Sequence, residues 1–263
     1  MDLLTHICSG AAAATIVAAF APGKPSGRLG IITAGVLGGA IPDVDVVSLW
    51  SRFDGTFGRL FGLSQPGRDI YGEKLWYSHH AFFHSLPAAL LLAVLFGLIA
   101  YGLYRIRRRP LSAYFSANTA VALGFIAGFL AHLLGDLPTP ASDWGGIAMF
   151  WPSKTYVGGT GKIWWWNNYD IFLLVFTCAV LNTLSVLFLK TRARRRVVTV
   201  AAVAALALAI VQVNTRHYDY DYTGNMPRYA EMEAESKAEQ RRILGPRLYN
   251  TMERFDRRVP INF

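Results

Sequence analysis

The stretch "SLPAALLLAVLFGLIAYGLY" occupies residues 85–104 and decides the fold class of this chain. It contains no charged residue, and about 20 mostly apolar residues are what a helix needs to cross the hydrocarbon core of a bilayer. Pro87 lies near the beginning of the stretch, where the first turn of a helix tolerates its missing N–H. We therefore predict a transmembrane helix over these residues.

Comparable apolar runs lie on both sides of this stretch, at residues 3–21, 116–137, 169–189 and 197–214, with a shorter glycine-rich run at 29–41. Only 16% of the chain is charged, against about 25% in soluble domains. We therefore predict an all-α, polytopic helical membrane protein with about six transmembrane segments. Residues 1–214 form the predicted membrane domain, and residues 215–263 form a polar tail.

The run at 29–41 is short, because its residues would span only about 20 Å as a helix. We expect it to end below the membrane surface. Small residues allow close helix packing in membranes, and we assign this role to Gly30, Gly35, Gly38 and Gly39.

The tail contains "YAEMEAESKAEQRRILGPRLYNTMERF" at 229–255, with acidic and basic residues interleaved. This pattern predicts a helix that is broken near Gly245 and Pro246, with Met, Leu and Tyr side chains on one face. We expect the helix to pack on the loops outside the membrane. A protein partner that binds through this tail is the alternative.

The basic residues predict how the chain is oriented in the membrane. Every second connection carries only basic charges: Lys24, Arg28, Arg105, Arg107, Arg108, Arg109, Lys190, Arg192, Arg194, Arg195 and Arg196. Cytoplasmic loops are enriched in Lys and Arg, so we predict that these connections are cytoplasmic and that both termini lie outside. The net charge of +9 is therefore explained by topology, and we expect no nucleic-acid partner. The first run lacks a basic leader region, so we expect it to remain as a helix.

Histidine and aspartate residues gather at the opposite, outer ends of the predicted segments. These residues are His6, Asp43, Asp45, His79, His80, His84, His132 and Asp136. His80 and His84, like His132 and Asp136, are spaced i,i+4, so each pair can share a helix face. We expect Asp43 and Asp45 to lie in an extended turn. Each residue alone fits a hydrogen-bonded interior position or a helix cap, but together they predict a metal site.

Imidazole nitrogen and carboxylate oxygen atoms suit divalent ions such as zinc or manganese. The predicted metal ligands are His6, Asp43, Asp45, His79, His84, His132 and Asp136. This set exceeds the four ligands of a closed zinc site, so two metal ions are an open alternative to one. We assign the role of general base to Asp45, His79 or His80.

Absent motifs exclude several enzyme classes. The chain has no HExxH motif of a metalloprotease, no P-loop and no GxSxG nucleophile elbow. The Lys-x6-Arg-Pro and Ser-Gly-His motifs of acid-phosphatase-type lipid phosphatases are also missing.

The ordered motifs of residues 1–155 resemble the YdjM/DUF457 family. They read "TH" at 5–6, "GGAIPDVD" at 38–45, "HHAFFHS" at 79–85, "HLLGD" at 132–136 and "FWPS" at 150–153. The resemblance implies an inner-membrane, metal-dependent hydrolase, and some members are described as binding LexA. His80 stands where the family often has Arg, and "LPTPASDWGG" replaces the usual Leu-Thr-x-x-Gly.

The loop 138–168 supplies aromatic side chains of the kind found among lipid headgroups: Trp144, Phe150, Trp151, Tyr156, Trp164, Trp165 and Trp166. We therefore expect a hydrolase of the cytoplasmic (inner) membrane that acts on a lipid or amphiphile ester or phosphoester at the outer interface. The alternatives are a divalent-metal transporter or sensor and a non-catalytic regulatory membrane protein. A transporter would place its ligands nearer mid-membrane.

Overall fold

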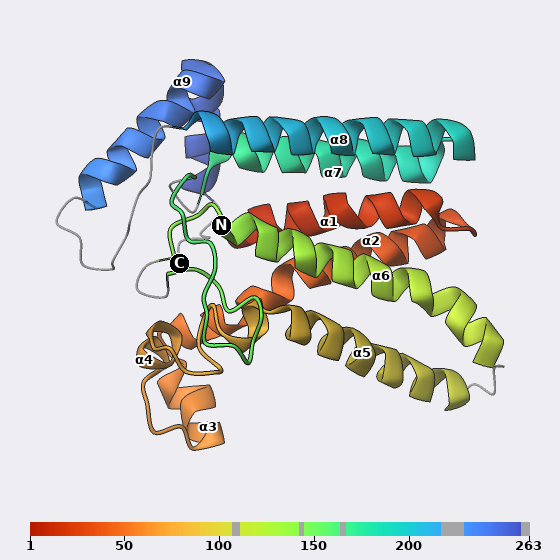
Figure 1. The fold of residues 1–263 in the computed structure, drawn as a ribbon, viewed down its shortest axis with the longest axis horizontal. Helices are drawn as coiled ribbons and strands as arrows, with labels where there is room; N and C mark the ends of the chain where they lie inside the picture. The colour runs from red at the N-terminus through yellow and green to blue at the C-terminus, as the bar shows by residue number, and fades with distance from the viewer. Residues whose placement is uncertain (107–110, 142–144, 164–166, 217–228, 259–263) are drawn as a thin grey trace.

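The structure is a computed structural model, and it describes residues 1–106, 111–141, 145–163, 167–216 and 229–258. Six long apolar helices run side by side (Figure 1): α1 (Leu3–Phe20), α2 (Pro25–Ala40), α5 (Leu86–Ile106), α6 (Leu111–Asp136), α7 (Tyr169–Phe188) and α8 (Thr191–Thr215). Each is long and apolar enough to cross a membrane. The prediction of an all-α membrane protein with six segments is confirmed.

Helices α1, α2 and α6 form the centre of the bundle, with backbones in close contact. A Cβ atom on Gly35 would lie 2.2 Å from the Cβ atom of Ala14, and one on Gly39 would lie 2.4 Å from the carbonyl oxygen of His6. Side chains larger than hydrogen would therefore separate these helices. The prediction of close packing is confirmed for Gly35, Gly38 and Gly39, but it is wrong for Gly30, which has no heavy atom within 4 Å of such a position.

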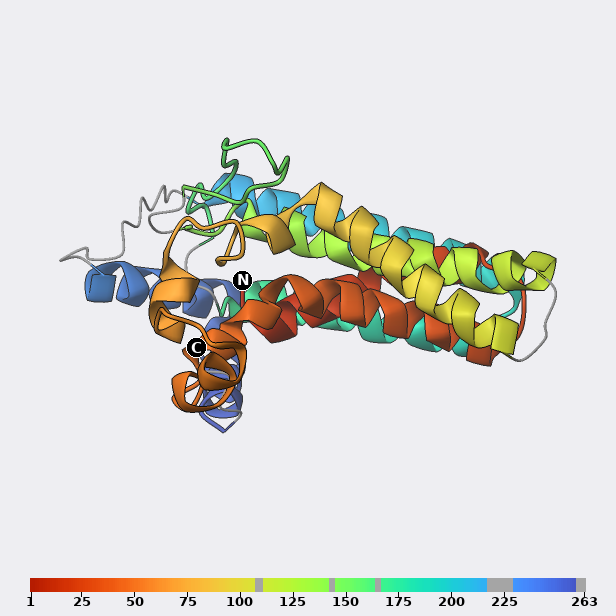
Figure 2. The ribbon, with the colours of Figure 1, turned by 90° about the horizontal axis from the view of Figure 1, so that it is seen from below.

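The remaining helices surround this centre. Helix α5 packs on α6 at one side of the bundle, and the α7–α8 pair packs on α1 at the other (Figures 1 and 2). At one end, the buried Arg194 donates from Nε to the carbonyl oxygen of Ala19 (3.0 Å), which satisfies an acceptor at the C-terminal end of α1. Arg28 and Arg195 belong to the same basic end. That this end is cytoplasmic stays a prediction.

Two features of the segment after α2 differ from expectation. Helix α2 begins at Pro25, four residues before the predicted run, and its apolar course continues to Leu49. Residues Ile41–Leu49 form a 3₁₀ helix, η1, rather than an extended turn. Pro42 lies in its first turn, where no N–H is required of it. The short segments η2 (Asp54–Gly58), α3 (Arg59–Phe61) and α4 (Gly67–Gly72) follow.

The tail forms α9 (Tyr229–Asp256), which is kinked at Gly245, a residue with φ 73°. The predicted break at Gly245 and Pro246 is confirmed. The second part of α9 packs on the start of α7, where the Tyr169 and Tyr249 rings lie 5.4 Å apart. The Tyr169 hydroxyl also donates to Asp256 (2.8 Å). The tail is thus fixed to the end of the bundle that carries the histidines (Figure 1).

Candidate metal centre

Four separate elements bring the histidines and aspartates together at one end of the bundle. His6 comes from the first turns of α1, Asp43 and Asp45 from η1, and His132 and Asp136 from the last turns of α6. The fourth element is the turn before α5, which ends in the short 3₁₀ helix η3 (Phe82–His84). The histidine side chains and Asp136 are buried, and Asp43 is nearly so.

Asp136 lies at the centre of the first group of ligand atoms. Its Oδ1 atom is 3.0 Å from Nε2 of His6, and its Oδ2 atom is 3.1 Å from Nε2 of His132. Yet His6 Nε2 and Asp136 Oδ2 make no hydrogen bond among the described residues, although both are buried. Buried polar atoms normally have a partner, because an unpaired one costs free energy. A cation bound between these atoms would be such a partner.

Asp43 connects this group to His84. Its Oδ1 atom is 3.4 Å from Nε2 of His84 and 3.6 Å from Nε2 of His132. The two imidazole Nε2 atoms are themselves only 3.3 Å apart. Three sets of side chains each place one ligand atom within 4.8 Å of the others: His6, His132 and Asp136; Asp43, His84 and His132; and His79, His80 and His84. His132 and His84 are each shared by two sets, so the sets form one continuous cluster.

Backbone carbonyl groups orient two of the rings. His132 Nδ1 lies 2.8 Å from the carbonyl oxygen of Gly39, and His80 Nδ1 lies 3.0 Å from that of Gly146. A carbonyl accepts only, so each Nδ1 must carry the proton, and a neutral ring then keeps its lone pair on Nε2. A hydrogen bond from one ring nitrogen to a carbonyl fixes the tautomer of a histidine that binds metal through the other nitrogen.

Asp45 lies against His79 rather than within any of the three sets. Both of its carboxylate oxygens are close to His79 Nδ1, at 3.2 and 3.1 Å. This pairing directs the other ring nitrogen of His79 toward the cluster side, where its ring is 4.8 Å from that of His84. The geometry therefore gives Asp45 the position of a residue that orients His79, whereas the sequence suggested a direct ligand.

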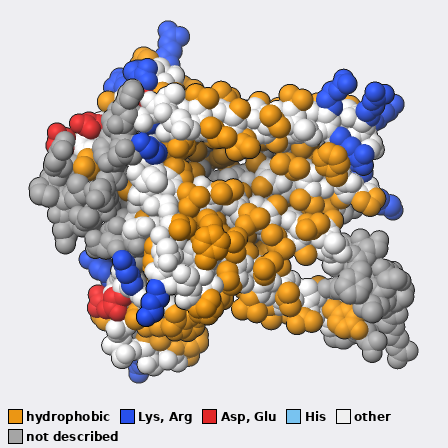
Figure 3. All heavy atoms as spheres, viewed as in Figure 1, with side chains coloured by type: hydrophobic (Ala, Val, Ile, Leu, Met, Phe, Trp, Pro, Cys, Tyr) orange, Lys and Arg blue, Asp and Glu red, His pale blue; other side chains and the backbone are white. Residues whose placement is uncertain are grey.

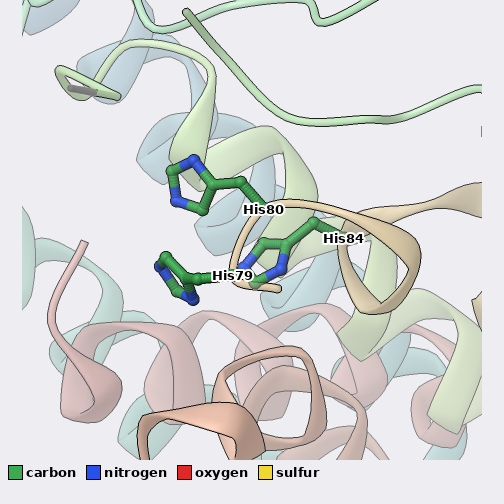
Figure 4. Close-up of side chains that lie close together, drawn as sticks. All are labelled: His79, His80 and His84. Carbon is green, nitrogen blue, oxygen red and sulfur yellow. The ribbon is translucent and has the colours of Figure 1, made fainter. Parts of the chain in front are cut away.

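The turn that carries His79, His80 and His84 differs from the predicted arrangement. His80 and His84 do not share a helix face, because His80 precedes the 3₁₀ helix and has φ 62°. A non-glycine residue in this left-handed region is uncommon and costs free energy. The His80 carbonyl accepts from the backbone N–H of Ala148 (2.8 Å), which helps to hold this conformation. Figure 4 shows the three rings gathered around the turn.

Burial controls the charge of these rings. It lowers the pKa of His84, and it lowers the pKa of His80 well below its usual range, with the neighbouring histidines acting in the same direction on His80. Both rings are therefore neutral near pH 7, which is the form that ligates metal.

Tyr71 of α4 was not predicted from the sequence. Its ring stacks on His79, with centroids 4.4 Å apart and planes 17° apart. Burial raises the pKa of the Tyr71 phenol, and Asp45, Asp43 and Asp136 raise it further. A protonated phenol, a hydrogen-bond donor, thus lies beside a cluster of acceptors. Tyr71 belongs to no motif, so only the folded structure reveals it.

The aromatic loop is only partly described. Trp144, Trp164, Trp165 and Trp166 lie outside the described residues, as does His217. Trp151 packs edge-on against Phe82, with centroids 4.9 Å apart, and so supports the histidine turn. Phe150 is exposed.

The donor set fits a divalent cation of intermediate hardness. Imidazole nitrogens and carboxylate oxygens converge in the three sets. The N-terminal ammonium group of Met1 also donates to Asp136 Oδ1 (2.9 Å). The fold and this cluster define a polytopic helical membrane protein with a candidate metal centre at one end of its bundle.

Comparison with known proteins gives the family. Residues 1–218 match the YdjM inner membrane protein family, and the chain belongs to it. Membership and the six apolar helices identify a multi-pass protein of the inner membrane. No curated protein and no solved structure matches the chain significantly.

Proposed function

We propose that this protein is a membrane-embedded, metal-dependent hydrolase that acts on an ester or phosphoester of a lipid or amphiphile. The observation that carries the proposal is the convergence of imidazole and carboxylate groups, with the Nε2 atoms of His84 and His132 3.3 Å apart beside the carboxylates of Asp43 and Asp136. Two buried carboxylates beside several imidazoles form a set of donor atoms that a divalent cation would bind.

The residues of the cluster would have two kinds of role: some would bind the metal ion, and others would accept or donate protons. His6, His132 and Asp136 would hold one zinc or manganese ion, and Asp43 and His84 would hold a second ion or complete the site of the first. A bound divalent ion lowers the pKa of water toward about 7 and polarises an ester or phosphoryl oxygen.

The His79–Asp45 pair is the best placed general base. Asp45 stabilises the positive charge that His79 gains when it accepts a proton, and it fixes the ring through both carboxylate oxygens. Tyr71, stacked on His79, is placed to donate a hydrogen bond to the oxygen that gains charge on the substrate.

The position of the cluster supports hydrolysis rather than transport. All three sets lie at one end of the bundle, and the structure records no second set of this kind at the basic end among the described residues. A transporter would instead place its ligands near mid-membrane.

The test is hydrolysis by purified protein stripped of metal and reloaded with zinc or manganese, on phospholipid and acyl-ester substrates in vesicles. Wild type should regain turnover on reloading, while His132→Ala should bind little metal and stay inactive. His217→Ala serves as the matched histidine control and should behave as wild type. Metal binding without turnover on any substrate would favour a transporter or sensor.

A further inference from the structure

The segment after α2 presents apolar side chains away from the metal centre. A 3₁₀ helix has three residues per turn, so every third side chain lies in one row. Val44 and Val47 of η1 and the C-cap residue Trp50 that follows them are exposed, at 53%, 42% and 47%. The two other rows include Asp43 and Asp45, which face the histidines. The segment that carries the candidate ligands therefore has an exposed apolar face on the side away from the histidines.

This exposed row continues into an aromatic series. The Trp50 and Phe57 rings lie 6.3 Å apart, and the Phe57 and Phe61 rings stack at 6.4 Å. Leu60 and Phe61 are 73% and 69% exposed. We call this surface the apolar ridge and define it by Val44, Val47, Trp50, Phe57, Leu60 and Phe61. A contiguous exposed apolar surface of this kind marks an interaction site.

The position of the apolar ridge in the fold indicates that it lies against lipid. In Figures 1 and 2 the segment with α3 and α4 lies at the metal-centre end and projects sideways from the bundle. The ridge directly continues the apolar span Pro25–Leu49. A part that projects sideways at the end of a transmembrane bundle meets lipid, because lipid surrounds the bundle.

Basic residues flank the apolar ridge. Arg52 and Arg59 are exposed and lie between its aromatic residues in the chain. Figure 3 shows hydrophobic side chains gathered at this projecting end, with Lys or Arg side chains and also Asp or Glu side chains at its margin. Aromatic residues with flanking Arg are typical of segments that lie in the headgroup zone of a bilayer.

We propose that the apolar ridge inserts into the leaflet on the metal-centre side, with Arg52 and Arg59 at the phosphate groups of anionic phospholipids. A second copy of the chain is a poorer occupant. A two-fold interface would bring the same patch of both copies together, and their arginines would then face each other.

The insertion would bring lipid to the metal centre. Val44 lies between Asp43 and Asp45, so acyl chains that contact the apolar ridge are one residue away from the carboxylates of the cluster. This step rests on the proposed function. It narrows the substrate class to phospholipids of that leaflet, with the bond to be cleaved at headgroup depth.

Depth-dependent fluorescence quenching tests the insertion without requiring metal or activity. Single cysteines replace Leu60 or Phe61 in a Cys8→Ala, Cys178→Ala background and carry an environment-sensitive label. The protein is reconstituted into vesicles of phosphatidylethanolamine and phosphatidylglycerol with spin-labelled lipid. The matched control is a cysteine at Asp69, an exposed polar position on the same projecting segment.

The label at positions 60 and 61 should be quenched several-fold more by the lipid spin label than the label at position 69. Equal quenching at all three positions would overturn the proposal. So would cross-linking between copies through position 61 without lipid quenching, which would assign the apolar ridge to a dimer. Folding of each variant is checked by its gel-filtration profile in detergent. Insertion without hydrolysis would contradict the proposed function alone.

Discussion

Two buried polar clusters lie at the same end of this bundle, and they differ in how their polar groups are paired. In the Arg216 cluster, defined by Arg216, Asp170, Asn168 and Gln240, donors face acceptors. Arg216 pairs with Asp170 and donates to Asn168 Oδ1 (3.2 Å), and Gln240 Oε1 accepts from the backbone N–H of Tyr169 (3.0 Å). In the candidate metal centre, imidazoles and carboxylates converge, and buried atoms such as His6 Nε2 and Asp136 Oδ2 have no hydrogen-bond partner among the described residues.

This difference separates a structural cluster from the candidate metal centre. The cation of the Arg216 cluster is a side chain, so it is present whenever the chain is folded, and the network fastens α9 to α7. The three sets of the candidate metal centre contain only imidazoles and carboxylates, and the N-terminal ammonium group of Met1 pairs with Asp136 (2.9 Å). If the cluster binds a metal ion from solution, as we propose, its stability should depend on what is bound.

The largest effect is expected from breaking the Arg216 cluster. Asp170→Ala leaves Arg216 buried without its carboxylate, and loss of one partner of a buried ion pair costs about 3–5 kcal/mol. Thermal unfolding in detergent should show a large decrease in melting temperature, while metal content per folded protein stays unchanged. Loss of metal at full stability would mean that the two clusters are not independent.

The next largest effect should distinguish a metal ligand from a neighbouring histidine within "HHAFFHS". His84→Arg should abolish metal binding and turnover, because a guanidinium group is permanently protonated and cannot ligate. His80→Arg should retain metal and part of any activity, since the family often has Arg at this position. Metal content and turnover are measured side by side, with folding checked by gel filtration. Equal losses would show that the roles are assigned wrongly.

A smaller, selective effect is expected for the residue that orients His79. Asp45→Asn should keep metal close to the wild-type content but lower turnover by about 10- to 100-fold, because Asp45 orients the His79 ring. Asp43→Asn is the matched control and should lower metal content itself. Should Asp45→Asn lose metal as Asp43→Asn does, Asp45 is a ligand, as its sequence position first suggested.

The smallest effect is expected for Tyr71→Phe, which keeps the stack on His79 and removes only the hydroxyl. Turnover should fall while metal content and melting temperature remain unchanged, because the phenol is placed to contact substrate rather than metal. A change in metal content with no change in turnover per bound metal would give Tyr71 a structural role instead.

Hydropathy was sufficient to predict most of the fold. Each of the six helices was identified as an apolar run, and the break in α9 followed from the adjacent Gly245 and Pro246. The 3₁₀ geometry of η1 was not predictable, because a short apolar stretch with two aspartates has no period that separates 3₁₀ from extended backbone. The exposed row of the apolar ridge was missed for the same reason.

The candidate metal ligands could be found because they cluster at segment ends, but their orientation could not. The carbonyl groups of Gly39 and Gly146 contact rings 93 and 66 residues away in the chain. Backbone carbonyls carry no sequence signal, and such contacts exist only after α2, α6 and the loops have packed. The same holds for the pairing of Asp45 with His79 and for the stacking of Tyr71.

The most direct test of the central claim is the metal content of protein purified without added chelator, measured by elemental analysis for wild type and His132→Ala. His132 belongs to two of the three sets, so its loss should remove metal from both. We expect one or two zinc or manganese ions per wild-type chain and little metal in the variant. Wild-type protein without stoichiometric transition metal, whose melting temperature does not change when zinc or manganese is added, would contradict the central claim.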